Sequence, residues 1–596
     1  MFKLLRYLDK KLYILTLAVI GLVIVQVYCD LELPELLTNI LTSASKASAL
    51  ATNGLLTDAL KEQYQTEVIS NGLLMFGFAG VSLLSAILVG FFASKIASGF
   101  SYSLRKAVYS HIQSFSINEI DRFSTASLIT RTTNDVTQVQ MVIVMVLRMA
   151  ISAPITAILG IVKAGKIESS ASLNTIVVIS VIALVILVVS IFLMVLPKFK
   201  KIQLFTDRLN LVTRENLTGI RVIRANCAQE YQEDKFDDVN SDVTSTNIFV
   251  NRVLNLMNPG MRIIMNGTSL AILWVGAYLI KENPLFLGSV FGFQQITMMI
   301  VMAFMQLIMI FIMVPRGLVS ANRIKEVLEV TPSISNPEVV VTPDESIIGE
   351  IEYKDVCFSY PNSSENILDS ISFKAHKGDI VAIIGSTGSG KTTLINLMPR
   401  FFDVTSGEVL IDGINVKNYD LNQLRDKIAF IAQKSLLFKG TVRSNLLYGK
   451  EDATEEEMIE ALKLSMSYDF VMNSDDKLDL GVAQGGSNFS GGQKQRLSIA
   501  RALIKKPEII VFDDSFSALD FKTDKILRNN LKDLEYTPTK VIVAQRIGTI
   551  MDADLILVLD EGKIVGAGKH KDLIRNCEVY QEIAYSQLSK EEIENA

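Results

Sequence analysis

Cysteine, histidine and tryptophan are scarce in this sequence of 596 residues, which contains four, three and one of them, respectively. The cysteines (Cys29, Cys227, Cys357 and Cys577) stand far apart, and none lies in a CxxC or Cys/His pattern. This spacing excludes a disulfide framework and a zinc site of the usual kind. The net charge of -5 is small for the length and gives no sign of a nucleic-acid partner.

Charged residues are absent from long runs in the first half of the chain. A helix needs about 20 apolar residues to cross the hydrocarbon core of a bilayer. Six runs before residue 316 are long enough, and Arg148 is the one charge inside them. The sequence therefore predicts six membrane-spanning helices, near 12–29, 68–94, 136–162, 169–197, 263–280 and 283–315.

Lysine and arginine are unevenly divided between the segments that join these runs. With the N-terminus inside, the inner segments hold 19 of them and the outer loops 5. By the positive-inside rule we expect both termini to be cytoplasmic. No signal-peptide cleavage site follows the first run, so we expect that run to be retained as a membrane helix. The inner segments 95–135 and 198–262 have the pattern of amphipathic, cytoplasmic extensions of the membrane helices.

The composition changes after Arg316. A proline-containing stretch precedes a region in which short apolar strands alternate with helices, the pattern of an α/β fold. We predict a transmembrane domain at 1–322, a linker at 323–346, a nucleotide-binding domain at 347–586 and a C-terminal tail at 587–596.

A phosphate-binding motif follows the apolar strand 380–384. The residues match G-x-x-x-x-G-K-[ST] between a strand and a helix, the context that marks a P-loop. Lys391 is expected to reach the β- and γ-phosphates of ATP, and the Thr392 hydroxyl to bind Mg²⁺. The strand 509–512 ends in Asp513 and Asp514, and Asp513 is predicted on the Mg²⁺ side. The predicted phosphate-binding residues are Gly385, Ser386, Thr387, Gly388, Ser389, Gly390, Lys391, Thr392 and Thr393.

Between these two strands lies Phe489-Ser-Gly-Gly-Gln493, which resembles the LSGGQ signature of the ATP-binding cassette superfamily. Tyr360, Gln433 and the segment 517–520 match further family motifs, and the segments 104–135, 215–224 and 321–328 resemble parts of the family's exporters. The resemblance implies a six-helix, all-α transmembrane domain and an α/β cassette with a helical signature subdomain.

The resemblance also implies roles for these residues. Tyr360 would stack on adenine, and Gln433 would join Asp513 and Thr392 at Mg²⁺. The signature residues Ser490, Gly491, Gly492 and Gln493, with Asp520, would complete an ATP site across a dimer.

Three positions depart from the family pattern. Asp514 stands where the family usually has a catalytic glutamate, Gln545 where it has a switch histidine, and Gln484 where exporters commonly have glutamate. We expect Asp514, Gln545 and Gln433 at the catalytic position and poor hydrolysis there. The pattern resembles the degenerate-site subunit of bacterial heterodimeric multidrug exporters, in which a partner supplies the consensus glutamate and histidine.

The predicted function is ATP-driven efflux of amphipathic or hydrophobic compounds, drugs or lipids, across the plasma membrane. Alternatives are a homodimeric exporter of lipid, peptide or polysaccharide, and a nucleotide-gated channel or regulator. Met298, Met302, Met305, Met309 and Met313 share one helical face and suit either a promiscuous pocket or ordinary helix contacts. Asp30 is expected at a solvated outer helix end unless its helix continues, and Arg148 and Arg262 in structural roles.

Overall fold

The computed structural model describes residues 2–166, 171–283, 285–341, 347–361, 363 and 365–587. Residues 342–346 of the predicted linker, 588–596 of the tail and the first residues of the fourth run lie outside this range. The chain forms two compact units. The first, here called the helical unit, comprises Met1–His111 and Ala126–Val330, and the second, the sheet unit, comprises Ile112–Thr125 and Thr331–Ala596.

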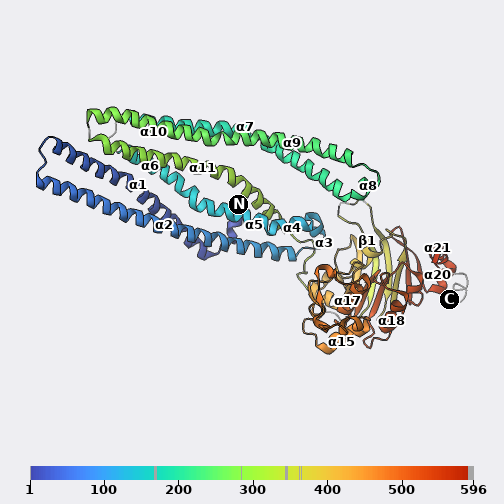
Figure 1. Ribbon diagram of the computed structural model, residues 1–596. Coiled ribbons are helices and arrows are strands. Elements are labelled where there is room, and N and C mark those ends of the chain that lie inside the picture. The colour runs from blue at the N-terminus through green and yellow to red at the C-terminus, as the bar shows by residue number, and fades with distance from the viewer. Residues whose placement is uncertain are drawn as a thin grey trace. The chain divides into compact units, whose positions relative to one another are not determined.

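Long helices dominate the helical unit (Figure 1). Within the described residues, six continuous helical stretches are long and apolar enough to cross a membrane, which confirms the predicted number of spans. The elements in chain order are η1 (Phe2–Tyr7), α1 (Lys10–Thr52), α2 (Asp58–Gln113), α4 (Thr125–Thr132), α5 (Asn134–Met145), the π-helical turn η2 (Val146–Ala150), α6 (Ile151–Ala164), α7 (Ala171–Thr218), α8 (Ile220–Ala225), α9 (Gln229–Asn255), α10 (Met257–Glu282) and α11 (Phe286–Glu329).

The membrane helices pack in two groups. Helices α1, α6 and α11 lie against one another, and α7 packs on α9 and α10 (Figure 1). Buried side chains such as Leu173, Phe293 and Ile300 form the contact between α7, α10 and α11. Side-chain hydrogen bonds join α1 to α2, from Ser82 to Asp30 over 2.5 Å and from Ser43 to Glu67 over 2.9 Å.

Two glycines set the close approach of α11 to α1. Gly288 and Gly292 are four residues apart and face α1 where Thr38 lies. A Cβ atom on Gly288 would overlap the backbone oxygen of Thr38, and one on Gly292 would overlap the Thr38 hydroxyl. Small residues at this spacing let membrane helices pack at short distance. Two glycines four residues apart within an apolar run are a packing signal that the sequence carries.

We expect Gly288→Ala to lower the apparent thermal midpoint of the purified protein by about 2–5 °C, because the α1 backbone must move to admit the methyl group. The control is Gly77→Ala in α2, where an added Cβ meets no atom within 4 Å. A scanning fluorescence melt in detergent measures both variants. Equal midpoints would contradict the assigned packing.

The described residues of the sheet unit form three sheets. A six-stranded sheet has the order β12-β11-β3-β10-β9-β6, with β12 antiparallel to β11 and the other neighbours parallel. An antiparallel sheet has the order β2-β1-β4-β5, and β7 pairs with β8. The strands are β1 (Ile351–Phe358), β2 (Leu368–Ala375), β3 (Ile380–Gly385), β4 (Ser406–Ile411), β5 (Ile414–Asn415), β6 (Ile428–Ile431), β7 (Gly440–Thr441), β8 (Gly481–Val482), β9 (Ile509–Asp513), β10 (Thr539–Val543), β11 (Leu555–Asp560) and β12 (Lys563–Gly568).

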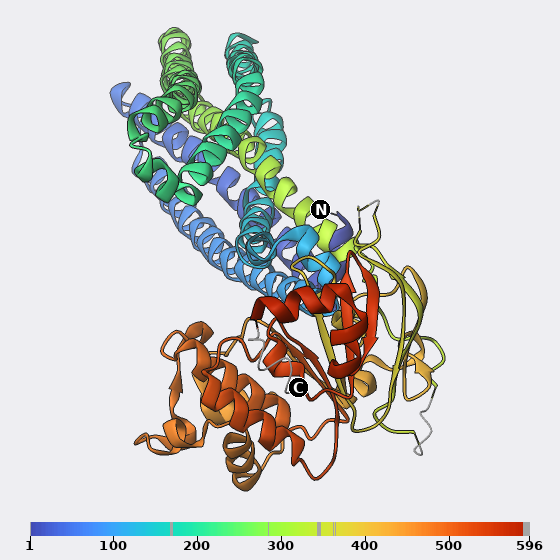
Figure 2. The ribbon, with the colours of Figure 1, turned by 90° about the vertical axis from the view of Figure 1, so that its right-hand side faces the viewer.

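Helices cover the six-stranded sheet, and a separate group of short helices carries its own core (Figure 2). That group, around Leu446, Leu462 and Leu497, is the predicted helical subdomain. The helices of the unit are α3 (Ile117–Phe123), α12 (Lys391–Asn396), η3 (Val416–Asn418), α13 (Leu421–Lys427), α14 (Val442–Leu446), α15 (Glu455–Leu464), α16 (Tyr468–Met472), η4 (Lys477–Asp479), η5 (Gln484–Gly486), α17 (Gly491–Leu503), α18 (Phe521–Lys532), α19 (Ile547–Ile550), α20 (His570–Asn576) and α21 (Glu578–Gln587). The observed architecture confirms the predicted fold class.

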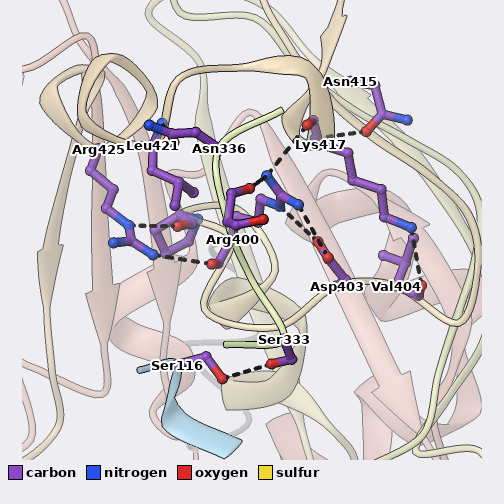
Figure 3. A network of polar contacts seen from close by, with 12 residues as sticks. Ser116, Ser333, Asn336, Arg400, Asp403, Val404, Asn415, Lys417, Leu421 and Arg425 are labelled. Atoms are coloured by element: carbon purple, nitrogen blue, oxygen red, sulfur yellow. Dashed lines mark hydrogen bonds and ion pairs between the residues drawn. The ribbon is translucent and has the colours of Figure 1, made fainter. Parts of the chain in front are cut away.

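The segment after α11 is fastened to the sheet unit by hydrogen bonds (Figure 3). Arg400 is buried, pairs with Asp403 at 2.8 Å and donates to the Ser335 carbonyl oxygen at 3.2 Å. Asn336 donates to Asp420 at 2.6 Å and accepts from the Leu421 amide at 2.9 Å. These contacts fix residues 335–336 in one conformation.

The same segment holds α3. The Ser333 amide donates to Glu119 at 3.2 Å, and the hydroxyls of Ser116 and Ser333 are 2.9 Å apart (Figure 3). Burial disfavours the charged form of Glu119, but hydrogen bonds from Ser116 and Ser333 outweigh it and lower the pKa of this carboxyl. Ile117 packs on the core beneath the antiparallel sheet, so α3 belongs to the sheet unit although its sequence lies between two membrane spans.

Candidate functional site

Four neighbouring strands of the six-stranded sheet end at the same edge. Strand β3 leads into the P-loop, β10 into Gln545, β9 into Asp513 and Asp514, and β6 toward Gln433. The register places Val543 of β10 beside both Ile383 of β3 and Asp513 of β9. Because the parallel strands share this edge, residues far apart in the sequence meet there, where ligands bind in open α/β sheets.

The P-loop has the backbone that the glycine pattern requires. Gly388 and Gly390 have φ values of +88° and +96°, which side chains rarely permit, and Gly388 faces open space. The Lys391 amine donates to the carbonyl oxygens of Gly385 at 3.0 Å and Ser386 at 2.5 Å. Burial lowers the pKa of Lys391, and the nearby charges of Asp514 and Asp513 oppose this shift. A free glycine face beside a half-buried amine fits a phosphate chain.

Two of the three predicted Mg²⁺ ligands, Thr392 and Asp513, are in contact. The Thr392 hydroxyl donates to Asp513 Oδ1 at 3.0 Å. Burial raises the pKa of Asp513, and the hydrogen bond from Thr392 opposes the shift. A hydroxyl and a carboxylate are hard oxygen ligands of the kind Mg²⁺ uses with bound phosphates. These residues therefore fit a magnesium ion that accompanies a nucleotide.

Asp514 lies at the centre of an amide network. Its Oδ2 atom accepts hydrogen bonds from Gln433 Nε2 at 3.2 Å and from Gln545 Nε2 at 2.9 Å. Its backbone has a φ of +47°, a left-handed conformation that aspartate tolerates better than most residues. The structure thus brings together all three residues that the sequence predicts at the catalytic position.

Tyr360 contacts the P-loop helix α12. Its hydroxyl is 3.1 Å from the Thr393 hydroxyl, and its ring packs edge-on against Phe358 and Phe402. This places an aromatic ring next to the phosphate-binding segment, where the sequence analysis expects the adenine.

The signature residues form a separate group on the helical subdomain. Ser490 caps α17 in a capping box, with its amide donating to the Gln493 side chain at 2.9 Å and its hydroxyl accepting from the Gln493 amide. A Cβ on Gly491 would meet no atom of this chain within 4 Å, whereas one on Gly492 would lie 3.3 Å from the Ala518 oxygen. The backbone at Gly491 is therefore open to a group from outside the chain.

Asp520 ends the segment 517–520, which approaches Gly492, and its hydrogen bonds go to residues of the adjacent helix α18. It caps α18 and accepts hydrogen bonds from the Thr523 amide at 3.0 Å and the Thr523 hydroxyl at 2.7 Å. These hydrogen bonds lower the pKa of its carboxyl.

One connection between the two groups escaped the sequence analysis. Ser435, two residues after Gln433, donates to Gln495 of α17, which is 2% exposed. The sequence carries no signal for this contact, because the burial of Gln495 follows only from the fold.

The last membrane helix presents polar and methionine side chains outward from this chain. Met302 and Met309 are 46% and 53% exposed, and Gln295 and Gln306 are exposed on the same face. Met305, by contrast, packs beside Leu184, Met261 and Ile308. The methionine face is thus divided between an internal contact and a surface that this chain leaves uncovered.

Charged residues of the membrane helices have the following surroundings. Helix α1 continues past Asp30 to Thr52, so Asp30 does not end a helix. Lys163 of α6 pairs with Glu32 at 2.7 Å and with Glu35 at 2.9 Å. Arg148 is exposed and lies in the π-helical turn between α5 and α6, and Arg262 is exposed on α10.

Comparisons with known proteins agree on one family. The family described as ABC transporter transmembrane region matches residues 16–304, and the family described as ABC transporter matches residues 368–517. An ABC transporter ATP-binding protein of Mycobacterium tuberculosis is 39% identical over 87% of this chain and 89% of its own length. The ABC transporter ATP-binding protein YfiB of Bacillus subtilis is 35% identical over 90% of this chain and 92% of its own.

An ATP-dependent lipid A-core flippase of Syntrophus aciditrophicus is 28% identical over 86% of this chain and 84% of its own. A solved bacterial Atm1-family ABC exporter with ATP bound covers 98% of this chain with 22% identity and a TM-score of 0.78, which shows a shared fold. With six membrane-spanning helices fused to one ATP-binding domain, this chain belongs to the ABC transporters and is an exporter half-transporter.

Proposed function

We propose that this chain is one subunit of a heterodimeric exporter that moves amphipathic or hydrophobic compounds, drugs or lipids, across the plasma membrane. ATP-binding domains of this family hydrolyse ATP, and its exporters work as dimers. In the proposed assembly this chain's own ATP site, here called its Walker site (the P-loop, or Walker A, with the Walker B aspartate Asp513 and the following Asp514), hydrolyses ATP poorly. Its signature completes a competent site on the partner.

The observation that supports this most is the hydrogen bonding of Asp514. A general base must place a carboxylate oxygen within hydrogen-bond reach of the attacking water, and a well-placed base contributes about 10²–10⁴-fold. Here Oδ2 of Asp514 accepts from both Gln433 and Gln545. Aspartate is also one methylene shorter than glutamate, which withdraws the carboxylate by about 1.5 Å. The two amides hold Oδ2 toward Gln433 and Gln545, and the shorter side chain withdraws the carboxylate, so both features place Asp514 poorly for the attacking water.

The second replacement, Gln545 in place of the switch histidine, removes a side chain that can carry a positive charge. Gln545 can donate a hydrogen bond to a γ-phosphate, but its amide cannot carry the positive charge of a protonated imidazole. Lys391 remains the phosphate-binding cation, and Thr392 with Asp513 and Gln433 would hold Mg²⁺. A bound Mg²⁺ would neutralise part of the phosphate charge. The site is therefore suited to retaining ATP and poorly suited to hydrolysing it.

The transport path would run along the uncovered face of α11. Methionines adapt to varied apolar shapes, and Gln295 and Gln306 add polar contacts beside them. The distribution of lysine and arginine supports cytoplasmic N- and C-termini, with the sheet unit inside the cell.

Purification of the tagged chain from its native host tests the proposal. We expect mass spectrometry to find a second half-transporter with glutamate after its Walker B aspartate and a switch histidine. This chain purified alone should show a few per cent of the ATPase rate of the pair. A full rate from the chain alone would favour a homodimeric exporter of lipid, peptide or polysaccharide. ATP-dependent conductance without vesicle transport would indicate a channel.

A further inference from the structure

The C-terminal helix α21 contacts the loop that carries Gln545. The Gln587 side chain donates from Nε2 to the Gln545 carbonyl oxygen at 2.8 Å and accepts at Oε1 from the Ile547 amide at 2.9 Å. One amide group therefore bridges the residues on both sides of Arg546. The bridge fixes two peptide groups of this loop relative to α21.

The helix that carries Gln587 is firmly anchored. Tyr580 and Ala584 of α21 are fully buried in the same core cluster as Ile547 and Ile550 of α19. The Tyr580 hydroxyl lies 2.7 Å from His570 Nδ1, which ties α21 to α20. Figure 1 shows α20 and α21 next to each other at the C-terminal end of the described chain. Gln587 thus extends from a rigid support.

Through Gln545, the contact connects Gln587 to Asp514 at the catalytic position. Gln545, whose carbonyl Gln587 holds, donates its own side-chain amide to Asp514 Oδ2 at 2.9 Å. A side chain reaches one defined position only when the backbone that carries it is fixed. This matters for glutamine because its side chain has three rotatable bonds.

We infer that Gln587 is a positioning residue that orients Gln545 toward the γ-phosphate of ATP, so that the C-terminal helix takes part in nucleotide sensing. The inference rests on the proposed role of Gln545 as the γ-phosphate contact. A cap of the short helix α19 would need only the bond to Ile547. The second bond, to Gln545 itself, is what a positioning role requires.

Three variants separate the two bonds. Gln587→Ala removes both, and Gln587→Glu keeps the acceptor for Ile547 but loses the donor to Gln545. The matched control is Gln581→Ala on the same helix, because the Gln581 side-chain amide donates to the Ile574 carbonyl oxygen and not to the loop that carries Gln545. Hydrogen exchange of the full-length transporter without nucleotide should show faster exchange at Ile547 in Gln587→Ala, and normal exchange in the other two.

Nucleotide preference is the second measurement. Photolabelling of this chain with 8-azido-ATP at 4 °C, competed by ATP or ADP, gives both affinities at its Walker site. A hydrogen bond to a charged phosphate strengthens binding substantially, so we expect Gln587→Ala and Gln587→Glu to reduce the preference for ATP over ADP by about three- to tenfold. ADP affinity should not change. In a Gln545→Ala background the further loss should vanish.

Unchanged exchange at Ile547 in Gln587→Ala would overturn the bridge. An equal loss of ATP and ADP affinity, or a loss that persists in Gln545→Ala, would show a structural role only and overturn the inference. If Gln545→Ala alone leaves the ATP preference intact, the proposed role of Gln545 fails, and the positioning role fails with it. Hydrogen exchange at the Ile547 amide would still show whether Gln587 forms the bridge, whatever the role of Gln545.

Discussion

Gly491→Asp is expected to reduce the ATPase rate of the proposed heterodimer by at least about 100-fold. A Cβ at this position meets no atom of the chain within 4 Å, so the substitution leaves this subunit's own packing intact. In the assembled dimer the new carboxylate would face the γ-phosphate held by the partner. Two like charges about 4 Å apart repel by about 4 kcal/mol at an effective dielectric constant of 20, enough to prevent closure around ATP.

The comparison variant is Asp514→Ala, which should reduce the rate by less than about threefold, because turnover is proposed to occur mainly at the partner's site. Gly481→Asp serves as the control, since Gly481 is a similarly open glycine of the helical subdomain outside the signature. Steady-state phosphate release in the purified heterodimer measures all three. If Asp514→Ala proves more damaging than Gly491→Asp, the chain's own site is the productive one and the asymmetric model is wrong.

The double variant Asp514→Glu with Gln545→His is expected to restore hydrolysis at this chain's own site. Asp514 and Gln545 already share a hydrogen bond of 2.9 Å, so their replacements should couple instead of adding independently. Each single change should raise the rate by less than about twofold and the double change by about tenfold, a fraction of what a general base contributes. Full recovery is not expected, because the partner's signature also shapes this site.

This measurement uses a heterodimer whose partner carries glutamine in place of its catalytic glutamate, which silences the other site. Phosphate release then reports on this chain alone. The left-handed backbone at residue 514 tolerates glutamate less well than aspartate, so the double variant should melt slightly lower. No rise in rate while nucleotide still binds would locate the defect in the partner's signature or in the coupling between the cassettes.

Much of the site could be predicted from sequence because its parts are local. The P-loop requires glycine where φ is positive, and Gly388 and Gly390 satisfy this at a fixed distance from Lys391. The carboxyl ends of parallel strands must share an edge, so Asp513 and Thr392 could be expected to meet, and they do at 3.0 Å. The six spans followed from long apolar runs in which Arg148 is the one charged residue.

Other features depend on tertiary structure and leave no short-range signal. The contact of Gln587 with Gln545 joins residues 42 positions apart, and that of Ser435 with Gln495 spans 60. Helical periodicity places Met302 and Met305 on one face, but which of them faces outward depends on how α11 is turned against α7 and α10. The inclusion of residues 112–125 in the sheet unit likewise depends on packing, through Ile117.

The fastening of residues 333–336 bears on how such transporters could be recombined. Arg400 is 7% exposed and takes one of its acceptors from Ser335, while Ile334 is buried. A cassette transplanted without these residues would expose part of its core and leave a buried guanidinium short of an acceptor. The movable module therefore begins at about Thr331, and a working chimera must also carry a helix equivalent to α3, with its glutamate, inside whichever membrane domain receives it.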